Sequence, residues 1–475
     1  MKRFLITFLI GISLFSIEGY SQEYEIKIKV DGLSDTTAFL AYYYGKGQYY
    51  KDTAEVNNKG EMTFAGKDSL AHGMYSLILN DVKYLDFIVD NQKFSLTTDT
   101  VNSIEAMKIK GSPENELFYE YLNFLNVRQR EAKSLQSELE NADESRKEEI
   151  NERMSMLDKE VRTYIDELHS DHEGSFTSNF IYALEFPQVP EPPKNDDGSI
   201  DSNFAFNYFK EHFFDNLDFT DQRLLNSSTY HEKVFYYMNK LTLQDPDSII
   251  KSVDYILGLA AQNPELFKYT LSNLTYKYER SEQMGMDAVF VHLAKNYFMK
   301  GMADDWFGEK ELKKLSERAN SLEPLLIGKK APNIVVKDTA QEQFIELYKI
   351  KAKYTVVYIW SPECGHCKIA TPKLKKIYDK YKDKGVEVFG VGNEFENKEW
   401  LEFIRKHDLN WINGSDGGDF RSNFRTLYDV YSTPQTYLLD ENKVILSKKM
   451  SVESLENILE FYFKGEEKAN GEEKK

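Results

Sequence analysis

The sequence predicts a multidomain protein with a β-sandwich-like N-terminal domain, an all-α middle region and a C-terminal α/β domain. A chain of 475 residues is too long for a single hydrophobic core. Apolar and polar residues alternate in the first hundred positions, whereas apolar residues recur at helical spacing in the middle. Short apolar runs then alternate with amphipathic stretches near the C-terminus. The predicted domains cover residues 22–110, 111–325 and 326–465.

Residues 1–21 have the composition of a secretory signal peptide. Lys2 and Arg3 are followed by an apolar stretch over residues 4–17, and the small residue Ser21 marks the expected cleavage site. The apolar stretch is too short to span a bilayer comfortably, so cleavage is favoured over a retained anchor. No later segment approaches 18 continuous apolar residues, so we expect no stable transmembrane anchor after cleavage. The mature chain is therefore expected to work outside the cytoplasm.

The charge balance excludes one class of partner. The chain has 60 Lys and Arg against 78 Asp and Glu, which gives a net charge of −18. Nucleic-acid-binding proteins need a basic surface. We therefore expect no nucleic-acid partner.

The β-rich N-terminal domain is predicted from period-two patterning. Residues 24–30 alternate apolar with charged side chains, as expected of a half-buried strand. Further strand-like segments follow, and turn sequences separate them at residues 31–32, 58–60 and 90–91. A compact two-layer or barrel-like sheet is the expected result.

The helical domain begins at the sequence Gly111-Ser112-Pro113-Glu114, a typical helix start. An apolar seam then predicts one half of an antiparallel helical hairpin with residues 114–140; its members are Ile150, Met154, Leu157, Val161, Tyr164 and Leu168. The proline-rich segment 186–199 predicts a loop. Residues 200–322 again have helical patterning and contain no glycine- or cysteine-based site motif.

The C-terminal domain is predicted from buried-strand runs that alternate with helices. The apolar runs include TVVYIW and VEVFGVG, and the helical stretches cover residues 366–383 and 397–408. This alternation predicts a mostly parallel sheet covered by helices. A terminal hairpin that turns at residues 440–443 and a closing helix over 452–463 complete the domain. Residues 466–475 predict a disordered tail.

The only two cysteines are Cys364 and Cys367. A disulfide between them closes a very small loop, so it would restrict the unfolded chain little, and a structural disulfide is the weaker explanation. A zinc site needs about four ligands, and no further cysteine or histidine pattern supplies them. His169 and His172 form a separate pair with no third ligand, so we predict no metal. A redox-active dithiol explains the pair best.

The position of the pair predicts unequal roles. Cys364 follows an apolar strand and stands where a helix begins, so the helix dipole and free N–H groups favour its thiolate. A protonated His366 would add positive charge. Cys364 is therefore the expected nucleophile, and Cys367, one turn further, is expected to resolve the mixed disulfide.

Four further motifs surround the pair. Gly328-Lys329-Lys330-Ala331-Pro332 precedes the first strand, and Trp360 stands four residues before Cys364. Pro372 lies five residues after Cys367, and Tyr431-Ser432-Thr433-Pro434 follows later. With these motifs, residues 326–465 resemble the thioredoxin fold of the AhpC/TSA superfamily, and within it the TlpA/ResA-like envelope thiol–disulfide oxidoreductases, a group connected with cytochrome c-type biogenesis.

The resemblance implies more about the site. It implies a cis Thr433–Pro434 bond beside the cysteines, with Thr433, Pro434 and Trp360 in contact with substrate. The Gly365-His366 pair resembles that of protein disulfide isomerase, which implies a couple less reducing than that of thioredoxin. Related proteins carry a proton-accepting carboxylate at the positions of Tyr358 or Ala370; Glu363 is the substitute suggested by adjacency.

The expected function is an exported thiol–disulfide oxidoreductase that reduces or isomerises disulfides. The resemblance implies a periplasmic or envelope location, disulfide-containing envelope proteins as substrates and a membrane or periplasmic thiol as electron donor. We expect no cofactor other than the redox-active Cys364–Cys367 disulfide. Two alternatives stay open: a thiol peroxidase of the peroxiredoxin group, and a non-enzymatic envelope binding protein with a vestigial redox domain. The N-terminal half resembles uncharacterised regions that precede thioredoxin domains in envelope proteins.

Overall fold

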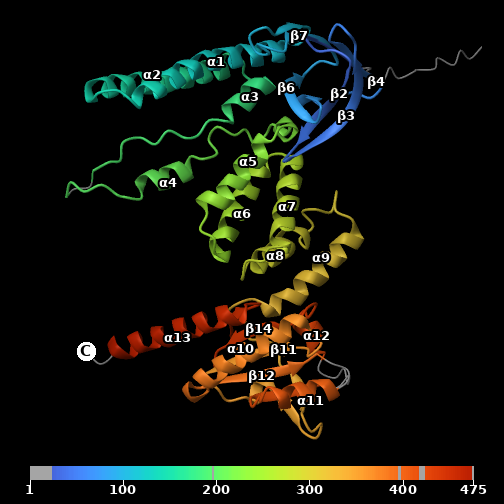
Figure 1. Cartoon of the computed structure of the whole chain (residues 1–475), viewed down its shortest axis with the longest axis vertical. Helices are drawn as coiled ribbons and strands as arrows, with labels where there is room; N and C mark the ends of the chain where they lie inside the picture. Colours follow the sequence, from blue (N-terminus) through green and yellow to red (C-terminus); the bar gives the residue numbers. More distant parts are fainter. Residues whose placement is uncertain (1–23, 195–196, 394–396, 417–422, 473–475) are drawn as a thin grey trace, which may run out of the picture. The chain divides into compact units, whose positions relative to one another are not determined.

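A computed structural model describes residues 24–194, 197–393, 397–416 and 423–472 (Figure 1). The predicted signal peptide, residues 1–21, lies outside these ranges. The chain divides into two compact units, 1–241 and 242–475. This division passes through the segment predicted as one helical domain, so the two units are described separately below.

The first unit begins with a strand-rich region of two four-stranded sheets, with strand orders β4-β1-β7-β8 and β3-β2-β5-β6. The strands are β1 (Tyr24–Asp31), β2 (Thr36–Tyr44), β3 (Gly47–Val56), β4 (Glu61–Gly66), β5 (Gly73–Leu79), β6 (Val82–Val89), β7 (Lys93–Asp99) and β8 (Lys108–Lys110). The predicted alternation in β1 is confirmed, because Tyr24, Ile26, Ile28 and Val30 are buried. Both sheets contribute to one hydrophobic core, and β1 pairs with β7 in parallel, which local turn patterns cannot predict.

A long helical hairpin follows, formed by α1 (Pro113–Leu139) and α2 (Glu144–Asp171), which lie side by side in Figure 1. Ser112 caps α1 as predicted by accepting a hydrogen bond from the Asn115 N–H. The predicted seam lies in the hairpin: Phe124 of α1 stacks on Tyr164 of α2 with ring centroids 3.8 Å apart. The seam also includes Ile165, which the predicted spacing left out and which is fully buried.

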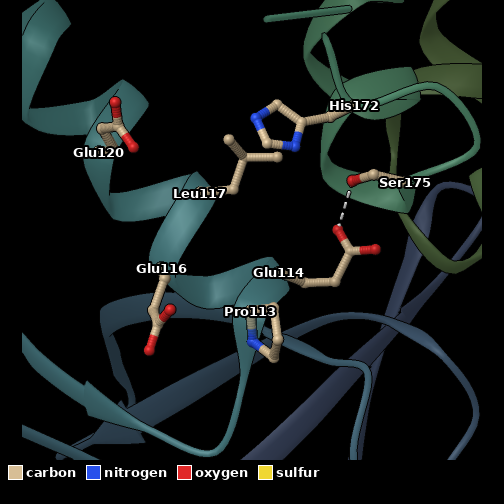
Figure 2. Close-up of a pocket in the computed structure, with 7 residues that line it drawn as sticks. All are labelled: Pro113, Glu114, Glu116, Leu117, Glu120, His172 and Ser175. Atoms are coloured by element: carbon tan, nitrogen blue, oxygen red, sulfur yellow. Dashed lines mark hydrogen bonds between the residues drawn. The ribbon is translucent and has the colours of Figure 1, made fainter.

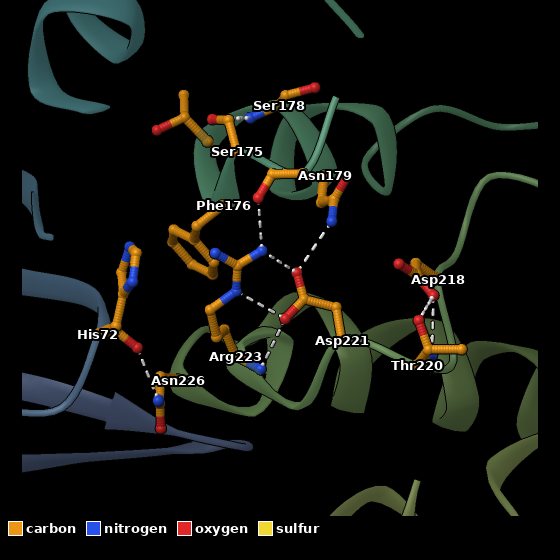
Figure 3. A network of polar contacts seen from close by, with 12 residues as sticks. His72, Ser175, Phe176, Ser178, Asn179, Asp218, Thr220, Asp221, Arg223 and Asn226 are labelled. Carbon is orange, nitrogen blue, oxygen red and sulfur yellow. Dashed lines mark hydrogen bonds and ion pairs between the residues drawn. The ribbon is translucent and has the colours of Figure 1, made fainter. Parts of the chain in front are cut away.

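The rest of the first unit contains short helices, and a polar network connects two of them to the strand-rich region. The short helices are α3 (Phe176–Tyr182), α4 (Phe204–Glu211), η1 (Gln222–Asn226), α5 (Thr229–Tyr236) and the π-turn η2 (Tyr237–Leu241). The two that the network connects are α3 and η1. In the network, Arg223 pairs with Asp221 at 2.7 Å, and Asn179 donates to Asp221 at 2.9 Å (Figure 3). Asn226 donates to the carbonyl of His72 at 2.7 Å. The network therefore joins the strand-rich region to helices more than a hundred residues later.

The second unit starts with a helical segment and continues into a seven-stranded sheet. The helices are α6 (Pro246–Ala260), α7 (Pro264–Glu279), α8 (Asp287–Leu293), η3 (Ala294–Phe298), α9 (Glu309–Leu322) and η4 (Glu323–Leu325). The strands are β9 (Val335–Asp338), β10 (Phe344–Glu346), β11 (Tyr354–Trp360), β12 (Val386–Gly392), β13 (Ile412–Ser415), β14 (Gln435–Leu439) and β15 (Ile445–Lys448). Their order is β10-β9-β13-β12-β11-β14-β15.

The expectation of a mostly parallel sheet is wrong. Among the strands that the structure describes, the pairs β11–β12 and β12–β13 alone are parallel; β9, β10, β14 and β15 join antiparallel. The apolar runs predicted strands that are buried on both faces, but such runs do not encode strand direction. The predicted terminal hairpin, β14–β15, is confirmed.

Helices cover the sheet and place the site. They are η5 (Leu347–Lys349), α10 (Gly365–Tyr381), η6 (Lys382–Lys384), α11 (Asn397–Lys406), α12 (Phe424–Leu427) and α13 (Val452–Glu472). Side chains of α10, α11 and α13 share one core with one face of β11 and β12, and α12 packs on the other face. The closing helix is longer than predicted and includes most of the predicted tail; residues 473–475 lie outside the described ranges. None of the helices in the described ranges has the length and apolar character that a membrane crossing requires.

Candidate functional site

The two cysteines lie at the junction between β11 and α10. Cys364 is the N-cap of α10, and its sulfur accepts a hydrogen bond from the Cys367 N–H, with an S···N distance of 3.4 Å. Cys364 is partly buried, whereas Cys367 is 0% exposed. The strand–helix junction therefore presents one sulfur to the surface and keeps the other inside the domain.

The surroundings give the two thiols opposite properties. Partial burial alone would raise the pKa of Cys364. Hydrogen bonds from the Thr433 side chain and from the backbone N–H groups of Cys367 and His366 outweigh that effect and lower its pKa below the ordinary value. Burial raises the pKa of Cys367 to about 12. At neutral pH the accessible sulfur is thus the better nucleophile.

The loop before β14 completes the site. The Thr433–Pro434 peptide bond is cis, as expected from the resemblance. The Cys364 thiol donates a hydrogen bond to the Thr433 carbonyl, with an S···O distance of 3.0 Å. The structure thus brings together Cys364, Cys367, Thr433 and Pro434, although the two segments are 69 residues apart in the chain.

Trp360 has a different place from the one predicted. Its side chain is 0% exposed and packs against Phe403 and Trp400, with ring centroids 5.2 and 6.3 Å away. A fully buried indole cannot contact a protein substrate. The prediction of substrate contact is therefore corrected: Trp360 belongs to the core that supports the cysteines.

The predicted tuning residues are on the surface. Gly365, His366 and Glu363 are exposed. The His366 backbone N–H hydrogen-bonds the Cys364 sulfur, and the Glu363 N–H donates to the Ser361 hydroxyl at 3.2 Å. Glu363 is exposed and Cys367 is buried, so the structure does not support direct proton transfer from Cys367 to Glu363. The role of Glu363 as proton acceptor stays a prediction.

The position that holds a carboxylate in thioredoxin is filled by a buried hydroxyl pair. Tyr358 is 0% exposed, and its hydroxyl lies 2.9 Å from that of Thr371 on α10. Burial raises the pKa of Tyr358 well above its ordinary value, so the phenol stays protonated. Thr371 was missed by the sequence analysis, because an isolated threonine in a helical stretch carries no signal.

The His169–His172 segment belongs to the first unit, whereas both cysteines belong to the second. His172 lines a pocket with Glu114, whose carboxylate accepts a hydrogen bond from the Ser175 hydroxyl (Figure 2). The N–H groups of Phe176 and Thr177, at the start of α3, donate to the same carboxylate. His169 stacks on Tyr182 with ring centroids 4.1 Å apart. Among the described residues, no three His, Cys, Asp or Glu side chains are grouped as a metal ion would require.

Comparison with known proteins assigns the domain that holds this site. A model of the AhpC/TSA family matches residues 327–448. The thiol-disulfide oxidoreductase ResA of Bacillus cereus (strain ZK / E33L) is 30% identical over 136 residues, which are 29% of this chain and 76% of ResA. This chain belongs to the ResA family of thiol–disulfide oxidoreductases. The resemblance seen in the sequence is thereby confirmed.

Other relatives of this ResA-family chain have similar descriptions. The thiol:disulfide interchange protein DsbE of Pseudomonas fluorescens biotype C is 27% identical over 131 residues, 27% of this chain and 68% of DsbE. A domain of a possible thiol-disulfide isomerase from Cytophaga hutchinsonii ATCC 33406 is 40% identical and covers 31% of this chain and 99% of its own, with a TM-score of 0.29. A thioredoxin-like protein from Bacteroides caccae ATCC 43185 is 20% identical and covers 58% of this chain and 98% of its own, with a TM-score of 0.44.

The rest of the chain matches families without an assigned role. Two models, each described as a domain of unknown function, match residues 24–118 (DUF4369) and 136–322 (DUF5106). The ResA-family segment is therefore preceded by two uncharacterised segments, as the sequence analysis expected.

Proposed function

We propose that this chain is an exported oxidoreductase that reduces or isomerises disulfides in envelope proteins through Cys364 and Cys367. The observation that carries the proposal is the placement of the Cys364 sulfur at the N-terminus of α10, 3.0 Å from the Thr433 carbonyl. At the helix N-terminus this sulfur is partly accessible and favoured as a thiolate, whereas its thiol form donates to the Thr433 carbonyl. By the resemblance, the adjacent loop with cis-Pro434 would offer its backbone to an extended substrate.

The reaction follows from the two thiols. The Cys364 thiolate attacks one sulfur of a substrate disulfide; an S–S bond forms, the substrate S–S bond breaks, and the released substrate thiolate takes up a proton. Cys367 then loses its proton and attacks Cys364. The mixed disulfide breaks, the second substrate thiolate leaves, and the Cys364–Cys367 disulfide remains. The substrate has gained two electrons.

The high pKa of Cys367, about 12, keeps it protonated before substrate binds. Cys364 is therefore the thiol that attacks the substrate first, and Cys367 reacts only after Cys364 has entered the mixed disulfide. In isomerisation, the substrate's own second thiol resolves the mixed disulfide instead, and no net electrons are transferred.

A reducing cycle needs a donor of two electrons. We propose a membrane or periplasmic thiol donor: one of its thiols attacks the Cys364–Cys367 disulfide, a second thiol resolves the mixed disulfide, and the donor is left oxidised as the dithiol is regenerated. No cofactor besides the redox-active disulfide is required for this exchange. The predicted signal peptide over residues 1–21 is what supports an envelope location.

The direction of electron flow is tested by the reduction potential of the pair. The purified chain is equilibrated with glutathione buffers, and free thiols are trapped at each step. A potential near about −270 mV indicates a reductant, and one near about −180 mV or above indicates an isomerase or oxidant. A pair that never equilibrates with glutathione would contradict the proposed function.

Substrates are identified with a trapping variant. Cys367→Ser removes the resolving thiol, so mixed disulfides with Cys364 should accumulate and be released by dithiothreitol. The matched control is the double variant Cys364→Ser/Cys367→Ser, which should capture nothing. Equal capture by both variants would mean that the captured proteins are not bound through Cys364.

A further inference from the structure

The last long helix before the ResA-family segment reaches the loop that contains Thr433. Arg318 of α9 forms an ion pair with Asp429 through Nη1 and Oδ1. The Asp429 side chain is 4% exposed, and that of Arg318 is 28% exposed. The guanidinium also lies over the Tyr431 ring, 5.4 Å from its centroid. One side chain of the helical segment thus contacts two residues of this loop.

The buried carboxylate of Asp429 needs a cationic partner to compensate its charge. Asp429 lies at φ 52°, and its carboxylate is buried, so its charge is costly unless paired. Within the part of the chain that the structure describes, its Oδ2 atom has no hydrogen-bond partner, and Lys449 Nζ is 3.7 Å from that atom. The direct hydrogen bond from Arg318 therefore supplies the main compensation for the buried charge.

The backbone of Asp429 organises the loop that follows. Its carbonyl accepts hydrogen bonds from the Tyr431 N–H and the Gln435 side chain, each at 3.1 Å. These two contacts close the segment around Thr433, whose carbonyl accepts the hydrogen bond from Cys364. Arg318 is therefore linked to the nucleophilic sulfur through Asp429, the backbone of residues 431–435 and the contact between Thr433 and Cys364.

The helical segment is itself fixed on the sheet. Lys448 of β15 is 3% exposed and forms an ion pair with Asp287 of α8. The same ammonium donates to the Leu325 carbonyl at 2.6 Å, and the Lys448 N–H lies 3.4 Å from the sulfur of Met284. Arg318 therefore projects from a scaffold held on the edge of the sheet.

We propose that Arg318 is a positioning residue of the redox site, which holds Thr433 against Cys364 through its ion pair with Asp429. The inference rests on the proposed function and deepens it. Arg318 lies inside the DUF5106 match, 136–322, and outside the AhpC/TSA match, 327–448. It gives the end of the uncharacterised helical segment a role in the reactivity of Cys364.

The test measures the thiolate of Cys364 directly. The full reduced chain is alkylated with iodoacetamide between pH 5 and 9, and the rate at Cys364 is followed by mass spectrometry. Arg318→Met keeps the apolar stem and removes the guanidinium. Loss of the hydrogen bond from the Thr433 side chain, which lowers the pKa of Cys364, should slow alkylation at pH 7 about tenfold and move the profile to higher pH. Arg318→Lys should restore most of the rate.

A matched control separates this effect from loss of a surface charge. Lys314 is exposed on the same helix, one turn before Arg318, so Lys314→Met should leave the rate within about twofold of the wild type. Superimposable profiles for Arg318→Met and Lys314→Met would overturn the proposal.

The route through Asp429 is tested by a double-mutant cycle. Asp429→Asn removes the buried charge, so adding Arg318→Met to this variant should change the rate by less than about twofold. If Arg318→Met still slows alkylation about tenfold in the Asp429→Asn background, Arg318 does not act on Cys364 through Asp429. If Arg318→Met does not fold, as judged by near-ultraviolet circular dichroism, Arg318→Lys and Asp429→Asn are compared instead; profiles identical to the wild type for both would overturn the proposal.

The two proposals fail in different measurements. Equilibration of the wild-type chain with glutathione tests the proposed function. Alkylation reports the Cys364 thiolate whether or not the pair exchanges with glutathione. An active wild type whose Cys364 profile is insensitive to Arg318 would overturn only the positioning role.

Discussion

The unequal burial of the two thiols predicts strong selectivity in alkylation of the reduced chain. With a pKa of about 12, only about one Cys367 molecule in 10⁴ is a thiolate at pH 8. An ordinary cysteine with a pKa near 8.5 is about one-quarter thiolate at that pH. The pKa of Cys364 is lowered, so its thiolate fraction is larger still. Iodoacetamide should therefore modify Cys364 more than about 10³ times faster than Cys367.

The assay must distinguish two cysteines on one peptide. Trypsin releases residues 354–368 with both thiols, so tandem mass spectrometry is needed to assign each modification. The rate at Cys367 should rise about tenfold for each pH unit between 8 and 11. Modification of Cys367 within tenfold of Cys364 at pH 8 would refute the reasoning. In Cys364→Ser, Cys367 should stay slow; fast modification there would show that burial does not protect it.

Three further predictions concern stability. Tyr358→Phe should lower the free energy of unfolding by about 1–3 kcal/mol, because it leaves the Thr371 hydroxyl buried without its partner. The double variant Tyr358→Phe/Thr371→Val should lose less stability, because it removes both hydroxyls. Urea unfolding followed by Trp fluorescence compares the two, and a larger loss in the double variant would contradict this reasoning. Glu114→Ala should lower the free energy of unfolding by about 2 kcal/mol, because three donors at the start of α3 lose their acceptor. Thermal unfolding measures this loss, and Glu116→Ala, at an exposed position, is the control. The pKa values of Glu114 and Asp221 are lowered in the folded state, so these carboxylates stabilise the fold above pH about 4, and this stabilisation is lost as the pH falls through the folded values. The melting temperature of Glu114→Gln should therefore fall less steeply between pH 2 and 7 than that of the wild type. Parallel curves would show that Glu114 does not contribute to the acid sensitivity.

Much of the local structure could be predicted because its causes are local. Alternation of side chains identified β1, a serine followed by proline identified the start of α1, and apolar runs identified β11 and β12. The cysteine pair between a strand and a helix identified the site in the same way. Strand direction was mispredicted for the C-terminal sheet, because the pairing of β9 and β14 with distant strands depends on chain topology rather than on local pattern.

The sequence by itself determined that this chain has a single dithiol at a helix start, because residue type and spacing set the helix dipole and the neighbouring N–H groups that act on Cys364. Only the tertiary structure decided which groups complete the site. Trp360 is buried because the sheet and its helices close over it. Thr433 meets Cys364 across 69 residues, and Arg318 meets Asp429 across 111. Such contacts depend on packing between distant segments, and no local pattern encodes them.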